Sequence, residues 1–150
     1  MTAMTTSGHT TTSSGLVAGI GAGSALVAIG FTAIGAHDWA EIGVMAAVIG
    51  LAAVLVYGLV VPRALGRESA GGTALALSIP AVALVVPAFW SGLPLVLGVA
   101  ALVVGNHGRH ARSGGITSIL GMVLGALAVV AYVTIYVSDA MNGGAGFLFD

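Results

Sequence analysis

The stretch Thr73–Gly105, TALALSIPAVALVVPAFWSGLPLVLGVAALVVG, decides the fold because it runs for 33 residues without a charged side chain. One α-helix of that length would be about 50 Å long at 1.5 Å per residue, well beyond the ~30 Å hydrocarbon core of a bilayer. Its middle, Pro87–Pro94, combines turn-forming residues with the aromatic pair Phe89 and Trp90. The stretch therefore predicts a tight hairpin of two short helices, about 73–89 and 93–110.

The composition of the whole chain points to an apolar environment. Of the 150 residues, 58% are hydrophobic and 6% are charged, and the mean hydropathy is +1.11. A soluble domain carries roughly a quarter charged residues, because water must solvate its surface. We therefore expect the apolar surface to face lipid, in an all-α, polytopic transmembrane bundle.

Three further uncharged stretches have the length of a membrane-spanning helix. They are 16–36, 42–61 and 116–137, and about 20 apolar residues cross a bilayer. With the hairpin they predict five spans in a single transmembrane domain, 16–137. The Thr/Ser-rich tail 1–15 is predicted to be disordered, and the tail 138–150 to be flexible. Since the first tail has no Lys or Arg, 16–36 is expected to be a retained span and not a cleaved signal peptide.

The four arginines discriminate between numbers of spans. With five spans, Arg63 and Arg67 share one side of the membrane with Arg109 and Arg112, as the enrichment of positive charge on the cytoplasmic side requires. With four spans the two pairs would lie on opposite sides. Five spans place the N-terminus in the cytoplasm and the C-terminus outside. A re-entrant hairpin across 73–110 would also keep the pairs together, so it remains an alternative, as do four spans.

Glycines at four-residue spacing mark two helix faces. Gly15, Gly19 and Gly23 lie on one face of the first span, and Gly121 and Gly125 on one face of the last. Because glycine has no side chain, such faces allow two helix backbones to approach closely. We interpret them as helix-packing faces, within the monomer or between monomers. The alternative is that glycine is simply frequent, at 24 of 150 residues.

The most polar segment is 106–112, NHGRHAR. Its side chains His107, Arg109, His110 and Arg112 are predicted to form, with the first arginine pair, a basic cytoplasmic turn. We interpret this turn as a determinant of topology whose long side chains reach the interface. The alternative is a site for lipid phosphates or an acidic partner, strengthened when the histidines are protonated.

A second polar group, His37, Asp38 and Glu41, follows the first span. A metal site would need a further ligand, because no other His or Cys lies near it in the sequence. We interpret the group as a solvated turn in which Asp38 caps the next helix.

Several classes of function are made unlikely by what the sequence lacks. There is no cysteine, the net charge is −1, and no ionisable side chain other than tyrosine lies deep in a predicted span. Thiolate chemistry, nucleic-acid binding, and proton-coupled or voltage-sensing transport all need such groups. The run 19–30, GIGAGSALVAIG, resembles the first helix of rotary-synthase proteolipid ring subunits. That family needs a carboxylate in its second helix, and 42–61 has none. We predict no catalytic, cofactor or metal site.

A longer segment carries a more extended resemblance. Residues 97–130, LGVAALVVGNHGRHARSGGITSILGMVLGALAVV, resemble the helix–basic turn–helix unit of small bacterial, often actinobacterial, membrane proteins of uncharacterised function. The matching residues are Ala101, Leu102, Gly105, Arg109, Arg112, Gly114, Ser118, Gly121, Leu124 and Gly125. The resemblance implies a small helical fold in the bacterial plasma membrane and no known activity.

These observations favour a non-enzymatic role. The expected function is that of a scaffold, accessory or assembly protein that acts through helix packing, with the lipid bilayer and a membrane-protein partner or second copy as its contacts. The alternative is a passive channel or small-solute transporter built from the same bundle.

Overall fold

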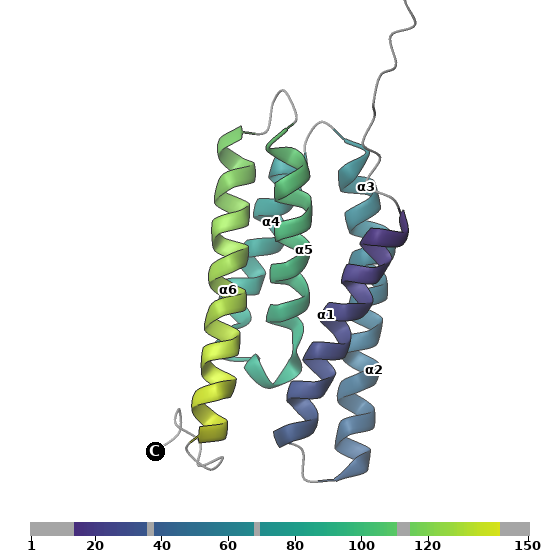
Figure 1. Cartoon of the computed structure of the whole chain (residues 1–150), viewed down its shortest axis with the longest axis vertical. Helices are drawn as coiled ribbons and strands as arrows, with labels where there is room; N and C mark the ends of the chain where they lie inside the picture. Colours follow the sequence, from purple (N-terminus) through teal and green to yellow (C-terminus); the bar gives the residue numbers. More distant parts are fainter. Residues whose placement is uncertain (1–13, 36–37, 68–69, 111–114, 142–150) are drawn as a thin grey trace, which may run out of the picture.

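All secondary structure in the part of the chain that the structure describes, residues 14–35, 38–67, 70–110 and 115–141 of a computed structural model, is helical. The elements are α1 (Ser14–Gly35), α2 (Trp39–Leu55), the π-helical turn η1 (Val56–Val60), α3 (Val61–Leu65), α4 (Ala70–Leu84), the 3-10 turn η2 (Phe89–Ser91), α5 (Leu93–Gly108) and α6 (Gly115–Met141). The helices lie side by side along the long axis of the molecule (Figure 1). The predicted all-α class is confirmed.

Three of the helical segments are long and apolar enough to cross a membrane: Gly15–Ile34, Trp39–Leu65 and Gly115–Met141. The other two, α4 and α5, are apolar but have only 15 and 16 residues, or about 23 Å each at 1.5 Å per residue. All five predicted stretches are thus helical. The helices also extend into both predicted tails, since α1 begins at Ser14 and α6 ends at Met141. The remainder of those tails lies outside the described residues.

The second predicted span does not end at Pro62, as the sequence had suggested. The helix continues through η1 and α3 to Leu65. In η1 the Val61 N–H donates to the carbonyl of Val56, five residues back. A proline normally clashes with the carbonyl four residues before it, here that of Gly58. The wider π-helical turn directly before Pro62 shifts the backbone carbonyls relative to their positions in an α-helix. We infer that this shift lets the helix continue beyond the proline.

The hairpin turn predicted at 87–94 is confirmed. Helix α4 ends at Leu84, earlier than expected, and α5 begins at Leu93 after η2. Ser91 closes the turn: its hydroxyl donates to the Ala88 carbonyl at 2.6 Å and accepts from the Leu93 N–H at 3.3 Å. Gly92 has φ +68°, a conformation that costs other residues steric strain. A Cβ there would also lie 2.9 Å from the Cβ of Ala28, so this turn packs closely on α1.

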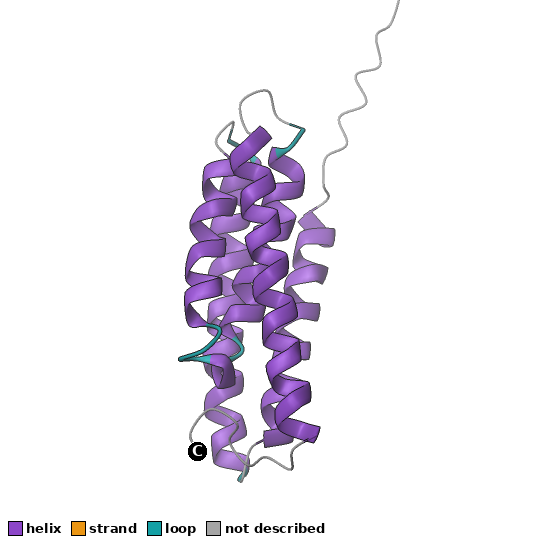
Figure 2. Ribbon diagram, turned by 90° about the vertical axis from the view of Figure 1, so that its left-hand side faces the viewer, coloured by secondary structure: helices purple, strands orange, loops and turns teal. Residues whose placement is uncertain are grey.

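The helices pack in two unequal groups. Helices α4, α5 and α6 contact one another closely, whereas α1 and α2 form a hairpin that is joined to this three-helix core mainly through α5. Both views show the α4–α5 turn stopping short of the ends of α2 and α6 (Figures 1 and 2). The bundle is therefore closely packed around α5 and more open beside α1 and at the end where α6 finishes.

Candidate functional site

Tyr57 joins the α1–α2 hairpin to the core. It lies in η1, is buried, and its hydroxyl donates to the carbonyl of Val96 in α5 at 3.3 Å. The Ser24 hydroxyl of α1 donates to the Gly21 carbonyl at 2.9 Å and lies 3.4 Å from the Tyr57 hydroxyl oxygen. The ring lies against Gly21, where an added Cβ would be 2.6 Å from Tyr57 Cγ. One side chain thus connects three helical segments.

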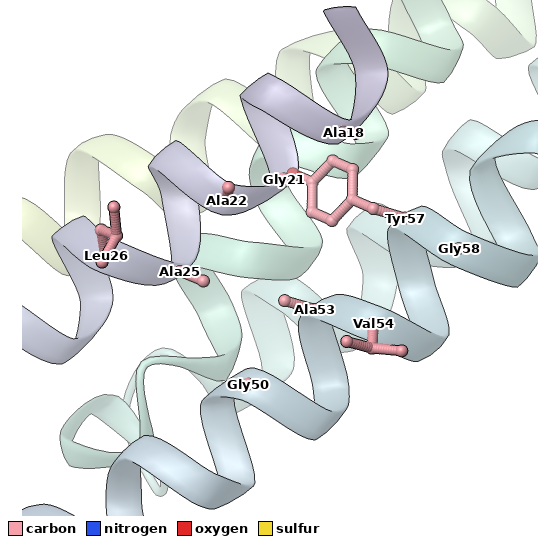
Figure 3. A pocket seen from close by; sticks show the side chains of 10 residues that line it. All are labelled: Ala18, Gly21, Ala22, Ala25, Leu26, Gly50, Ala53, Val54, Tyr57 and Gly58. Carbon is pink, nitrogen blue, oxygen red and sulfur yellow. The ribbon is translucent and has the colours of Figure 1, made fainter. Parts of the chain in front are cut away.

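Beside Tyr57 a groove of about 520 Å³ opens between α1 and α2 (Figure 3). Seven of its ten lining residues are glycine or alanine, contributed by both helices: Ala18, Gly21, Ala22, Ala25, Gly50, Ala53 and Gly58. Leu26 and Val54 complete the wall with Tyr57. The Tyr57 ring occupies the space between the two helices at Gly21, and the small residues beyond it leave that space unfilled. The groove is apolar and carries no charged side chain.

The glycines predicted from the sequence have different surroundings in the structure. Around Gly15, Gly19 and Gly23 there is open space: an added Cβ would meet no atom within 4 Å. The glycine of α1 that makes a close contact is Gly21, which does not belong to the helix-packing face predicted from the sequence. At Gly125, by contrast, an added Cβ would lie 2.8 Å from the Gly98 carbonyl oxygen.

Three glycines of α5 belong to the same closely packed core and were missed by the sequence analysis. A Cβ added at Gly98 would lie 2.9 Å from the Gly125 carbonyl oxygen. A Cβ added at Gly105 would lie 2.9 Å from the Ser118 carbonyl oxygen, and one added at Gly108 would lie 2.5 Å from the Ser118 hydroxyl oxygen. A signal for them was present. The small residues 98, 101, 105 and 108 alternate between spacings of three and four, which places them on one helix face.

The basic residues gather at one end of the bundle, where α3 and α5 finish (Figure 1). Arg63, Arg67, Arg109 and His110 are exposed there and His107 is half-buried. The Arg63 guanidinium donates to the Leu59 carbonyl at 3.0 Å. Arg112, the remaining member of the predicted basic turn, lies outside the described residues.

The three carboxylates of the described residues, those of Asp38, Glu41 and Asp139, lie at the opposite end. Asp38 precedes α2 and accepts a hydrogen bond from the Glu41 N–H at 2.7 Å, so its predicted role as a helix cap is confirmed. His37 lies outside the described residues. Among those that are described, no group of three or more His, Cys, Asp or Glu side chains is placed to hold a metal ion.

Three buried serine and threonine hydroxyls are satisfied by their own helix backbone, whereas the buried hydroxyls of Ser118 and Tyr132 have no hydrogen-bond partner among the described residues. Ser24, Thr32 and Ser78 each donate to the carbonyl three residues earlier, at 2.9 Å. Hydroxyls held in this way are unavailable as donors to a solute passing through the bundle.

No family model, curated protein or solved structure matches the chain. What the protein does must therefore be inferred from its groove, its exposed helix faces and its charges.

Proposed function

We propose that the protein is a five-span integral protein of the bacterial plasma membrane, and that it acts as a non-enzymatic scaffold that binds a transmembrane helix of a partner protein at α1. One observation carries the proposal: α1 packs sparsely on the rest of the protein and presents both Gly19 and Gly23, with open space around them, and an apolar groove. The resemblance of 97–130 to small bacterial membrane proteins supports the proposed location.

A membrane environment explains the exposed side chains. Large apolar residues cover the outward faces of the three long helices, among them Ile34, Val54 and Ile116. In water such a surface would be strongly unfavourable, whereas lipid solvates it. The charged side chains of the described residues lie at the two ends, where they can reach water. The arginines at one end support a cytoplasmic location for that end, and with it for the N-terminus.

The topology can be tested by labelling single cysteines, because the chain has none of its own. Val86, 61% exposed in the α4–α5 turn, should react with a membrane-impermeant maleimide in intact spheroplasts after substitution Val86→Cys. Asn106→Cys, at the basic end, should react only after the membrane is permeabilised. Met141→Cys, at the end of α6, is the reference for a residue outside the cytoplasm and should react in intact spheroplasts. A re-entrant hairpin would make Val86→Cys behave like Asn106→Cys.

The α1 surface has the chemistry of a helix-association site. In lipid the hydrophobic effect does not drive helices together, and close contact between small residues contributes instead. Gly19 and Gly23 are one turn apart, and Ala22 and Leu26 beside them form one wall of the groove. A partner helix placed along the two glycines would therefore also cover the edge of the groove, into which its larger side chains could insert.

Site-specific crosslinking tests this association. A photoreactive phenylalanine at Leu26, which is 69% exposed at the edge of the groove, should crosslink the partner in native membranes. In the double variant Gly19→Leu/Gly23→Leu the crosslink should fall roughly tenfold, equivalent to about 1.4 kcal/mol. Gly43→Leu on α2, also with open space around it, is the matched control. Equal crosslinking in both variants would exclude the glycine face, and a crosslink between copies would identify a homo-oligomer.

The alternative function, a passive channel or small-solute transporter, has less support. Such a protein needs polar groups along a path between its helices, and the buried hydroxyls of Ser24, Thr32 and Ser78 donate to their own helices. Solute-selective leakage from liposomes containing the purified protein would favour this alternative over the scaffold.

A further inference from the structure

The short α4–α5 hairpin leaves a recess at the acidic end of the bundle. Because its turn stops short of the ends of α2 and α6 (Figures 1 and 2), those helices extend past it. A cavity of about 180 Å³ lies beside the turn, with walls from α1, α2, η2 and α6. This is about six times the ~30 Å³ that one water molecule occupies in the liquid. The space suits a ligand of a few heavy atoms and is separate from the groove beside Tyr57.

Two carboxylates from helices far apart in the sequence line this cavity, Glu41 of α2 and Asp139 of α6. Glu41 is exposed and Asp139 is half-buried. Asp38 lies one turn from Glu41 without lining the cavity, and no basic side chain is among the lining residues. The arginines of the described chain are at the opposite end of the bundle. The net charge of the lining residues is therefore negative, which favours a cation.

Three aromatic side chains also line the cavity: Phe89 and Trp90 of η2 and Tyr136 of α6. The rings of Phe89 and Tyr136 are 5.8 Å apart between centroids and inclined at 66°. The Tyr136 hydroxyl donates to the Trp90 carbonyl at 3.5 Å, which links the turn to α6. Aromatic faces attract organic cations. Ca²⁺ and Mg²⁺ instead take six or more oxygen ligands, of which these two carboxylates, with Thr32, would supply only a part.

We propose that this cavity binds a small methylated ammonium cation, held by the two carboxylates and the aromatic rings. The inference goes beyond the scaffold function and does not rest on it, because it involves the other end of α1 and a different set of residues. The charged carboxylates compensate the cation, and the rings solvate its methyl groups. Met45 provides a further apolar contact at the wall.

Tetramethylammonium is a suitable probe, and Trp90 a suitable reporter. The chain has two tryptophans, and Trp39 lies outside the cavity wall and is 87% exposed. In the full-length Trp39→Phe protein in an uncharged detergent, tetramethylammonium should change the Trp90 fluorescence saturably. At equal ionic strength tert-butanol, which has the same number of heavy atoms and no charge, should bind at least about tenfold more weakly, a difference of 1.4 kcal/mol.

Charge-removing variants locate the site. Glu41→Gln and Asp139→Asn should each weaken tetramethylammonium binding roughly tenfold, since each removes one opposing charge at short range. Asp38→Asn is the matched control: it removes the same charge at the same end of the bundle, and asparagine caps a helix as well as aspartate does. It should weaken binding less than either cavity variant, because Asp38 is exposed and does not line the cavity, so its carboxylate interacts with the cation across water.

Four results would overturn the proposal. The first three are an unsaturable response to tetramethylammonium, equal binding of tert-butanol, and an effect of Asp38→Asn as large as that of Asp139→Asn. Competition by sodium at the same concentration as tetramethylammonium would show an inorganic cation site and would overturn it too. The comparison of the two probes needs no variant beyond Trp39→Phe, so a substitution that disturbs folding does not remove the test.

Discussion

Gly125→Val is expected to separate α6 from α5 and to lower the free energy of unfolding by about 3 kcal/mol or more. A Cβ at position 125 would lie 2.8 Å from the Gly98 carbonyl oxygen and 3.0 Å from the Ala101 Cβ. Neither atom can rotate away, because one belongs to the backbone and the other is fixed to it. The contact is reciprocal, since a Cβ at Gly98 would lie 2.9 Å from the Gly125 oxygen.

The free energy of unfolding can be measured by titrating SDS into protein held in an uncharged detergent, with tryptophan fluorescence as the signal. Gly115→Val is the control on the same helix, because an added Cβ there meets nothing within 4 Å. Its effect should stay within about 0.5 kcal/mol. If the two substitutions destabilise equally, the close approach of α5 and α6 does not hold the core together.

Gly21→Val should destabilise the protein by about 2 to 3 kcal/mol through a different contact, that between α1 and Tyr57. An added Cβ would lie 2.6 Å from Tyr57 Cγ and 2.9 Å from its Cβ. A change of side-chain rotamer cannot relieve the clash fully, because the Tyr57 Cβ is fixed to the backbone and does not move with it. The two helical segments must separate, and the hydrogen bond from Tyr57 to the Val96 carbonyl would be lost with them.

A double-mutant cycle isolates this contact. Tyr57→Gly removes the clashing atoms, so Gly21→Val should cost little once Tyr57→Gly is present, and the coupling energy should be about 2 kcal/mol. Gly23→Val is the matched control in α1, where there is open space. It should leave the unfolding free energy unchanged, whereas substitution of this face is expected to reduce partner crosslinking. Additive effects of the pair would show that Gly21 and Tyr57 are not in contact.

Much of the secondary structure could be predicted because it depends on properties of short segments. An uncharged stretch of 20 residues is helical in lipid, since its backbone polar groups must be satisfied within the segment. The PAFWSGLP turn was likewise recognisable from Pro87, Gly92 and Pro94. The cap at Asp38 follows from one side chain and the backbone three residues later. The end of the second span was wrong because sequence rules stop a helix at a proline, and here a π-helical turn precedes Pro62.

The glycines show where such prediction ends. Four-residue spacing identifies residues on one helix face, but it does not say which neighbour that face meets. In α1 the close contact is made by Gly21, on a different face from Gly19 and Gly23, because Tyr57 of η1 projects there. The partner of Gly125 is Gly98 of α5, and the packing faces predicted from the sequence were on α1 and α6 only.

The sequence by itself therefore determined that this protein consists of apolar helices, where the hairpin turns, and that its arginines gather near one set of helix ends. These properties follow from composition and from spacing along single helices. Only the tertiary structure decided that Tyr57 holds α1 and α2 apart beside a groove, and that Glu41 and Asp139 line one cavity with three aromatic rings. The physical reason is that both sites depend on the lateral arrangement of helices and on an α4–α5 hairpin shorter than its neighbours.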